Sequence, residues 1–139
     1  MPLITATEIN IIAFSTPIDP ALILDEIINA AENKFIIPAI TKPVYDDLSV
    51  HPGIYTTLIA DYIKPYLAYC VKFLLYSQYL NESSADATIL QQRGETVNES
   101  NTISQVKRTL LINHLLSGIY PQYVSPVKKR ITGFLINKK

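Results

Sequence analysis

The chain has 139 residues, of which 48% are hydrophobic, and its twelve basic residues balance its twelve acidic ones. This length fits one domain, and the apolar content is typical of a folded protein rather than a disordered one. A net charge of zero argues against a dedicated nucleic-acid binder, which usually carries a clear basic excess.

The charges are distributed unevenly along the chain. Residues 1–63 contain eight acidic and two basic residues, a net charge of −6, whereas residues 64–139 contain ten basic and four acidic residues, a net charge of +6. Two solvated faces would explain this pattern, because exposed ion pairs contribute little to stability. A subunit with opposite poles that meets copies of itself head to tail would explain it as well.

The sequence gives three indications of where the chain folds. One cysteine, Cys70, cannot form an internal disulfide, so we expect a reducing compartment. The opening residues, MPLITATEIN, lack a basic region followed by an apolar one, so we expect no secretory signal. Residues 62–80 and 109–127 are the most apolar stretches, but each contains polar residues or proline, so we expect no membrane span.

The first predicted element is a short helix over about residues 6–13. Thr5 stands at its start and Glu8 follows three residues later, the capping-box pattern in which each side chain satisfies a backbone donor. Pro17 ends any continuation of this helix.

A second helix is predicted to begin at Pro20. Asp19 can cap it, and proline at the first helical position loses no hydrogen bond. Its apolar stripe consists of Leu24, Ile27, Ile28, Ala31 and Phe35. Pro38 is expected to end this helix by about residue 36, and TKPVYDDLSVHPG then predicts one or two helical turns.

The longest predicted helix covers about thirty residues from Gly53. Pro65 lies inside it, where proline removes a hydrogen bond and costs roughly 3 kcal/mol. Either the helix kinks near residues 61–65 or two helices meet there, and we favour one kinked helix.

A helical projection of residues 62–80 separates three groups of side chains. The aliphatic group, expected to be core, comprises Ile63, Leu67, Cys70 and Leu74. The aromatic group comprises Tyr62, Tyr66, Tyr69, Phe73 and Tyr76. The remaining side carries Lys64, Ala68, Lys72 and Tyr79. Tyrosine suits boundaries between dry and wet regions and is enriched at interfaces. The aromatic rings could therefore pack inside the monomer, form a subunit interface or stack on a ligand, and the sequence leaves these alternatives open.

The rest of the chain predicts a polar segment, another helix and a basic end. Residues 86–98 are polar and predict either a mobile loop or a small hairpin around Gly94. A helix capped by Ser100 or Asn101 follows and ends near Gly118. Taken together, the elements predict an all-α fold: a small helical bundle over residues 1–120, with residues 121–139 forming a C-terminal docking arm or short helix.

Residues that could support catalysis or metal binding are few and scattered. His51 and His114 are far apart in sequence, and we expect His114 to be a partly buried structural residue. Cys70 is flanked by apolar positions and should be inert. Asp46 and Asp47 follow a proline and are expected to decorate a solvated turn. No known nucleophile, metalloprotease or phosphate-binding pattern occurs, so we expect no enzyme, no cofactor and no metal.

The end of the chain carries a basic cluster without any acidic residue among its charges: Lys128, Lys129, Arg130, Lys138 and Lys139. At physiological salt such charges act over about 8 Å. The side chains of this cluster could contact water, an acidic partner or DNA phosphates.

Several stretches together resemble the head–tail connector proteins of tailed bacteriophages, also called adaptor or neck ring proteins. These stretches are the LIT..E opening, DPALILDEIINAAENKFIIPAI, YDDL, the long tyrosine-bearing helix and the closing helix. The resemblance covers most of the chain and is strongest over residues 3–48, with AENKFIIPAI followed by YDDL as its most specific part. The version here is most similar to those of phages that infect Bacteroidetes, including crAss-like phages.

This resemblance implies a helical bundle that assembles into a ring, commonly of twelve copies. Such a ring docks under the portal protein at the capsid vertex, contacts other neck or tail proteins, and lets DNA pass through its lumen. By analogy, residues 121–139 would be the docking arm, and residues 83–101 would face a neighbour or the lumen. The expected location is the neck of the virion, after assembly in the host cytoplasm. No functional residue is transferred by the resemblance.

Three hypotheses follow for the function. The first is a structural virion protein that forms a neck ring, with the aromatic group as subunit interface and the basic cluster facing a partner or DNA. The second is a small helical regulator that binds one partner protein without forming a ring. The third is a helical nucleic-acid-binding domain, whose binding would weaken steeply with salt.

Overall fold

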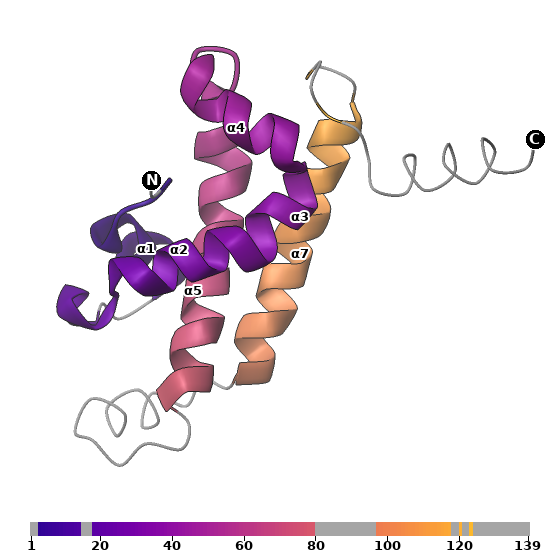
Figure 1. Cartoon of the computed structure of the whole chain (residues 1–139). Helices are drawn as coiled ribbons and strands as arrows, with labels where there is room; N and C mark the ends of the chain where they lie inside the picture. Colours follow the sequence, from indigo (N-terminus) through magenta and orange to yellow (C-terminus); the bar gives the residue numbers. More distant parts are fainter. Residues whose placement is uncertain (1–2, 15–17, 80–96, 118–119, 121–122, 124–139) are drawn as a thin grey trace, which may run out of the picture.

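A computed structural model describes residues 3–14, 18–79, 97–117, 120 and 123, and every regular element within these ranges is helical. The predicted all-α class is therefore confirmed. Figure 1 shows α5 (Lys64–Tyr79) and α7 (Val97–Leu116) side by side with opposite chain directions, while α2 (Asp25–Ala31) and the segment after it cross α5. Helix α1 (Ala6–Ala13) also packs on α5, so α5 lies at the centre of the bundle.

The start of α1 follows the sequence prediction. The Glu8 backbone N–H donates to Thr5 Oγ1 over 3.2 Å, and the Thr5 backbone N–H donates to Glu8 Oε1 over 3.1 Å. This reciprocal capping satisfies two backbone donors that a helix start otherwise leaves unpaired.

The second helix does not begin at Pro20 as predicted. Asp19 does accept a hydrogen bond from the Ala21 backbone N–H, but only a 3₁₀ turn, Pro20–Leu22, follows. Ile23 then leaves the helical conformation and is buried at 4% exposure, and α2 starts at Asp25. Burial of Ile23 accounts for the break, because a continuous helix would place this side chain at a different angle.

Helical structure continues past Pro38, which corrects the predicted end near residue 36. It also continues past Pro65. A π-helical segment precedes each proline, Glu32–Ile36 before α3 (Ile37–Ile40) and Leu58–Ile63 before α5. Proline has no N–H and its ring clashes with the carbonyl four residues earlier. The wider π turn removes that clash, so the chain passes each proline without ending the helix.

The turn between α3 and α4 (Lys42–Val50) consists of one residue, Thr41. Its φ of 75° and ψ of 154° are strained for a β-branched side chain, because this region favours glycine. The Thr41 backbone N–H donates to the Ile37 carbonyl, and the Thr41 carbonyl accepts from the Tyr45 N–H. This corner reverses the chain and brings α4 back toward the residues that precede α3.

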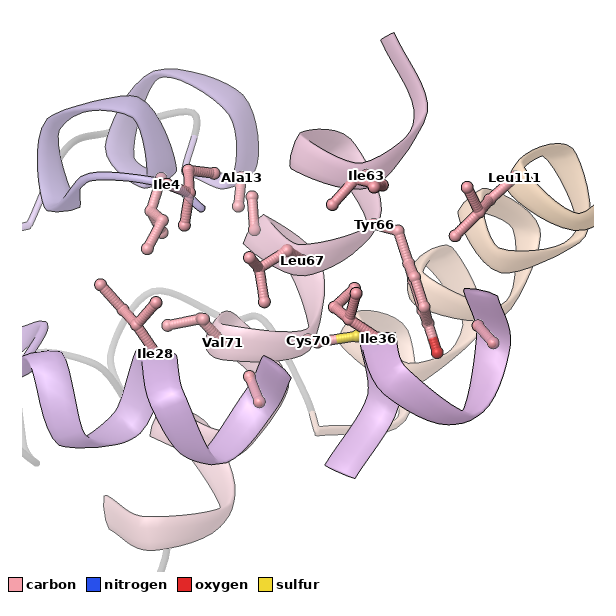
Figure 2. Packing of buried hydrophobic residues seen from close by; sticks show 14 of the residues in the cluster. Ile4, Ala13, Ile28, Ile36, Ile63, Tyr66, Leu67, Cys70, Val71 and Leu111 are labelled. Atoms are coloured by element: carbon pink, nitrogen blue, oxygen red, sulfur yellow. The ribbon is translucent and has the colours of Figure 1, made fainter. Parts of the chain in front are cut away.

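Helix α5 is buried on more sides than the sequence suggested. Figure 2 shows Tyr66, Leu67, Cys70 and Val71 of α5 amid side chains of α1, of α2 with the π segment after it, and of α7. Ala68 and Lys72, expected on the remaining side, are also buried, at 0% and 4% exposure. Leu75 is fully buried, whereas Leu74, predicted to be core, is only partly buried.

The predicted segment 86–98 and the arm 121–139 lie mostly outside the described residues. Val97 and Asn98 belong to α7, so this helix begins before the expected cap at Ser100 or Asn101. The ring of Tyr123 packs against the core, so contacts with the bundle extend at least to this residue.

The burial of α5 predicts different costs for two neighbouring truncations. Leu75→Ala should lower the free energy of unfolding by about 2–5 kcal/mol, because it leaves a cavity in a closed core. Leu74→Ala should cost clearly less, because part of its side chain already faces solvent. Equilibrium urea unfolding measures both values, and an equal or larger loss for Leu74→Ala would show that the rotation of α5 differs from that described here.

Candidate functional site

The five aromatic residues proposed as a subunit interface all have contacts inside the chain. Tyr66 and Tyr76 are buried at 1% and 5% exposure, whereas Tyr62, Tyr69 and Phe73 are partly buried. Phe73 meets Phe35 edge to face, with ring centroids 6.3 Å apart, and Tyr76 packs on Phe14. Only the three partly buried rings therefore have surface for a partner, and their contact with one stays a prediction.

Tyr62 belongs to an aromatic stack that joins three parts of the chain. Its ring lies on the His114 ring with centroids 4.0 Å apart, and His114 Nε2 is 2.7 Å from the Tyr120 hydroxyl. Tyr120 in turn stacks on Tyr55. Burial raises the pKa of Tyr120. His114 is thus the partly buried structural histidine that the sequence predicted, and it links α7 to the residues before α5.

A second cluster surrounds the amine of Lys72. Its Nζ donates to the Ala13 carbonyl over 2.7 Å and lies 4.9 Å from the Phe14 ring centroid. The rings of Tyr69 and Tyr76 are within 5.9 Å of the same amine. Cation–π attraction and the hydrogen bond offset part of the cost of removing this charge from water. The cluster attaches the end of α1 to the middle of α5.

A buried carboxylate, Glu32, joins the first residues of the chain to α4. The Leu3 backbone N–H donates to Glu32 Oε2 over 3.1 Å, and the Tyr45 hydroxyl donates to Oε1 over 2.9 Å. Glu32 is 1% exposed. Burial and the neighbouring carboxylate raise the pKa of Tyr45 to about 12. Sequence reasoning missed this site, because the three residues are distant along the chain and match no motif.

Asp46 and Asp47 have different environments, which corrects the prediction of a solvated pair. Asp46 is exposed and pairs with Lys42. Asp47 accepts from the Tyr55 hydroxyl over 2.6 Å and lies 2.8 Å from His51 Nδ1. The hydrogen bond from Tyr55 is the main cause of the lowered pKa of Asp47, and the hydrogen bond with His51 lowers it further. Asp47 therefore fixes the loop after α4 rather than decorating a turn.

One further ion pair connects α1 with α5, between Glu8 and Lys64. The hydrogen bond to Lys64 is the main cause of the lowered pKa of Glu8. Glu8 thus has two roles, because the same carboxylate completes the helix cap at Thr5.

Metal binding and thiol chemistry both depend on how the described His, Cys, Asp and Glu side chains are placed. Within them no three His, Cys, Asp or Glu side chains lie close enough to hold a metal ion. Cys70 is buried, and burial raises the pKa of its thiol to about 12, which agrees with an inert side chain. No helix in the described ranges is long and apolar enough to cross a membrane.

The basic residues proposed to face a partner or DNA, from Lys128 to Lys139, lie outside the described residues. Comparison with known proteins adds no further guide to the site: no family model, no curated protein and no solved structure matches the chain.

Asp47 gives a prediction on acid stability. A carboxyl with a lower pKa in the folded state contributes stability that is present above its unfolded pKa and is lost as the pH falls through the folded pKa. The melting temperature of the protein should therefore fall on acidification from about pH 6 to about pH 3, and Asp47→Asn should reduce this fall. Thermal unfolding monitored by circular dichroism measures it.

Asp46→Asn is the matched control for this experiment. Its exposed pair with Lys42 should contribute little, so the pH profile should stay that of the natural protein. A profile for Asp47→Asn that coincides with the control would contradict the role given to Asp47.

Proposed function

We propose that this chain is a structural virion protein, a subunit of a neck ring that connects the capsid portal to the tail and lets DNA pass through its lumen. The proposal starts from the resemblance to head–tail connector proteins. It implies a homo-oligomer, commonly of twelve copies, with the portal protein and other neck or tail proteins as partners. The residues of the bundle then serve packing and assembly rather than catalysis.

One observation carries the proposal beyond the sequence resemblance. Leu3 of the LIT..E opening, Glu32 of AENKFIIPAI and Tyr45 of YDDL meet at the buried Glu32 carboxylate. The pieces on which the resemblance depends are therefore parts of one hydrogen-bonded unit. This convergence agrees with treating residues 3–48 as one folded unit in which the three stretches lie together.

Location in the particle tests the proposed function directly. We expect a tagged copy of the protein to be present in purified virions and to be found by immunogold electron microscopy at the vertex where the tail joins the head. A tagged capsid protein, labelled over the whole shell, is the control. Absence from the virion, or label spread over the capsid, would contradict the proposal.

The basic cluster predicts how the ring docks. Reversal of three charges, Lys128→Glu, Lys129→Glu and Arg130→Glu, should weaken binding to the portal protein without changing the melting temperature, because long-range attraction sets much of the association rate. Surface plasmon resonance at two salt concentrations measures the effect.

The matched control for this docking experiment reverses two exposed charges elsewhere, Lys34→Glu and Lys42→Glu, and should leave portal binding unchanged. A large loss of melting temperature in the triple variant would count against a docking role for residues 121–139. Equal binding by both variants and the natural chain would do the same.

A further inference from the structure

We infer that an apolar strip on α7 of one subunit docks into the groove between α2 and α5 of the next subunit. The inference rests on the proposed function, since it specifies how copies of this chain join in the ring. It differs from the earlier interface hypothesis, in which the aromatic residues of α5 met the neighbour. Two of those five rings are buried inside the chain, so these two contribute no surface to a contact with a neighbour.

The strip consists of Ile103, Val106 and Leu110, which are 38%, 55% and 49% exposed. Their spacing of three and four residues places them along one line of the helix, where they form a ridge. Ile11 of α1, 76% exposed, lines the same cavity as Ile103 and extends the apolar surface. Contiguous exposed apolar side chains of this kind mark interaction surfaces.

The groove lies on another side of α5. It is lined by Ile27 and Ala30 of α2, by Leu74 and Ser77 of α5 and by Glu26 at its edge, and has a volume of about 430 Å³. Leu24, 48% exposed, precedes Ile27 by three residues and extends this apolar face. The groove therefore offers aliphatic walls to an incoming helix.

Lys107 beside the strip and the acidic residues at the groove carry opposite charges. Lys107 lies beside the strip, within one turn of Ile103 and Leu110, whereas Glu99 places an acidic charge one turn before Ile103 in the same cavity. The groove edge carries Glu26, next to the exposed Asp25. A strip docked in the groove would bring the charges of α7 toward those of α2. Opposite charges at an interface rim steer association and fix register.

The positions of the surfaces determine the symmetry of the assembly. The cavity beside the strip reaches α5 at Tyr69 and Lys72, whereas the groove reaches it at Leu74 and Ser77, about 80° to 160° away around the helix. One subunit can therefore use its strip and its groove at the same time. Such a head-to-tail contact repeats with every added subunit and forms a closed ring when the rotation closes.

Two blocking variants of the full chain test this arrangement. Val106→Glu places a charge on the strip, and Ala30→Arg fills the groove and reverses its charge. The natural chain should self-associate with rising concentration in sedimentation velocity experiments, and each variant should associate more than about tenfold more weakly. A mixture of the two variants should form a one-to-one dimer and stop there, because only one intact strip and one intact groove remain.

Two further variants add controls. Gln105→Glu changes an exposed residue on α7 away from the strip and should assemble like the natural chain. Glu26→Lys and Lys107→Glu should each weaken assembly, and their combination in one chain should restore it. Recovery of assembly in the double variant would show that the single substitutions act through this charge contact, because a second substitution would not repair a damaged fold.

Several results would overturn the inference. These are a natural chain that stays monomeric at every concentration, natural association that stops at a dimer, blocking variants that assemble normally, and a mixture that forms no heterodimer. A Val106→Glu monomer that melts several degrees lower would also do so, because the strip would then be covered by the chain's own residues.

The two proposals fail separately. If the protein lies at the virion neck but the blocking variants assemble normally, the proposed interface is wrong and the proposed function stands. If the protein associates through these surfaces but is absent from the virion neck, the proposed function is wrong and the proposed interface stands.

Discussion

The structure depends on enclosing α5. This helix is apolar around most of its circumference, and a helix of that kind is stable only when other elements cover it. In the described residues α1, α2 and α7 supply that cover, and the π segments before Pro38 and Pro65 let the chain keep its helical path while it wraps the centre. Because each covering helix is short or weakly amphipathic, none is expected to be stable apart from α5.

Polar groups inside such a core must find partners, and their partners determine the arrangement. The Lys72 amine, held by the Ala13 carbonyl, fixes where α1 ends on α5. The Glu32 carboxylate, held by Leu3 and Tyr45, fixes α4 and the chain start against the π segment after α2. Breaking one side of a buried charged hydrogen bond costs more than the bond contributes. These clusters therefore specify one packing among the many that an apolar core alone would permit.

The sequence predicted what is local. The all-α class followed from periodicity and capping, and the Thr5–Glu8 cap was predicted because both partners lie within one turn. The break at Ile23 was missed, because Asp19 and Pro20 give the same start signal for a 3₁₀ turn and an α-helix. The continuation past Pro38 was missed for a different reason. A π turn is stabilised by the packing around it, which local sequence does not reveal.

The errors at the candidate sites have physical origins. The helical projection placed Lys72 outside the aliphatic and aromatic groups, yet it is buried, and the carbonyl that binds it is 59 residues away. Asp47 was expected in a solvated turn because the Asp46–Asp47 pair follows a proline, but Tyr55 and His51 fold back onto it. For the aromatic residues of α5 the sequence left core packing and a subunit interface open, and two of the five rings are core. For Lys72 a contact with a distant segment decides the environment, whereas for Asp47 the return of the chain after α4 decides it.

The same enclosure bears on assembly. Once α5 is covered, the rings of Tyr66 and Tyr76 are already committed inside the chain and contribute to the stability of the subunit rather than to association. Within the described residues, exposed apolar side chains lie on the covering helices, where the α7 strip and the α2–α5 groove are found, and also at Val50 and Ile54. Association through the covering helices leaves the enclosed centre intact. In the assembly proposed above, each copy would bring a core that its own chain already closes.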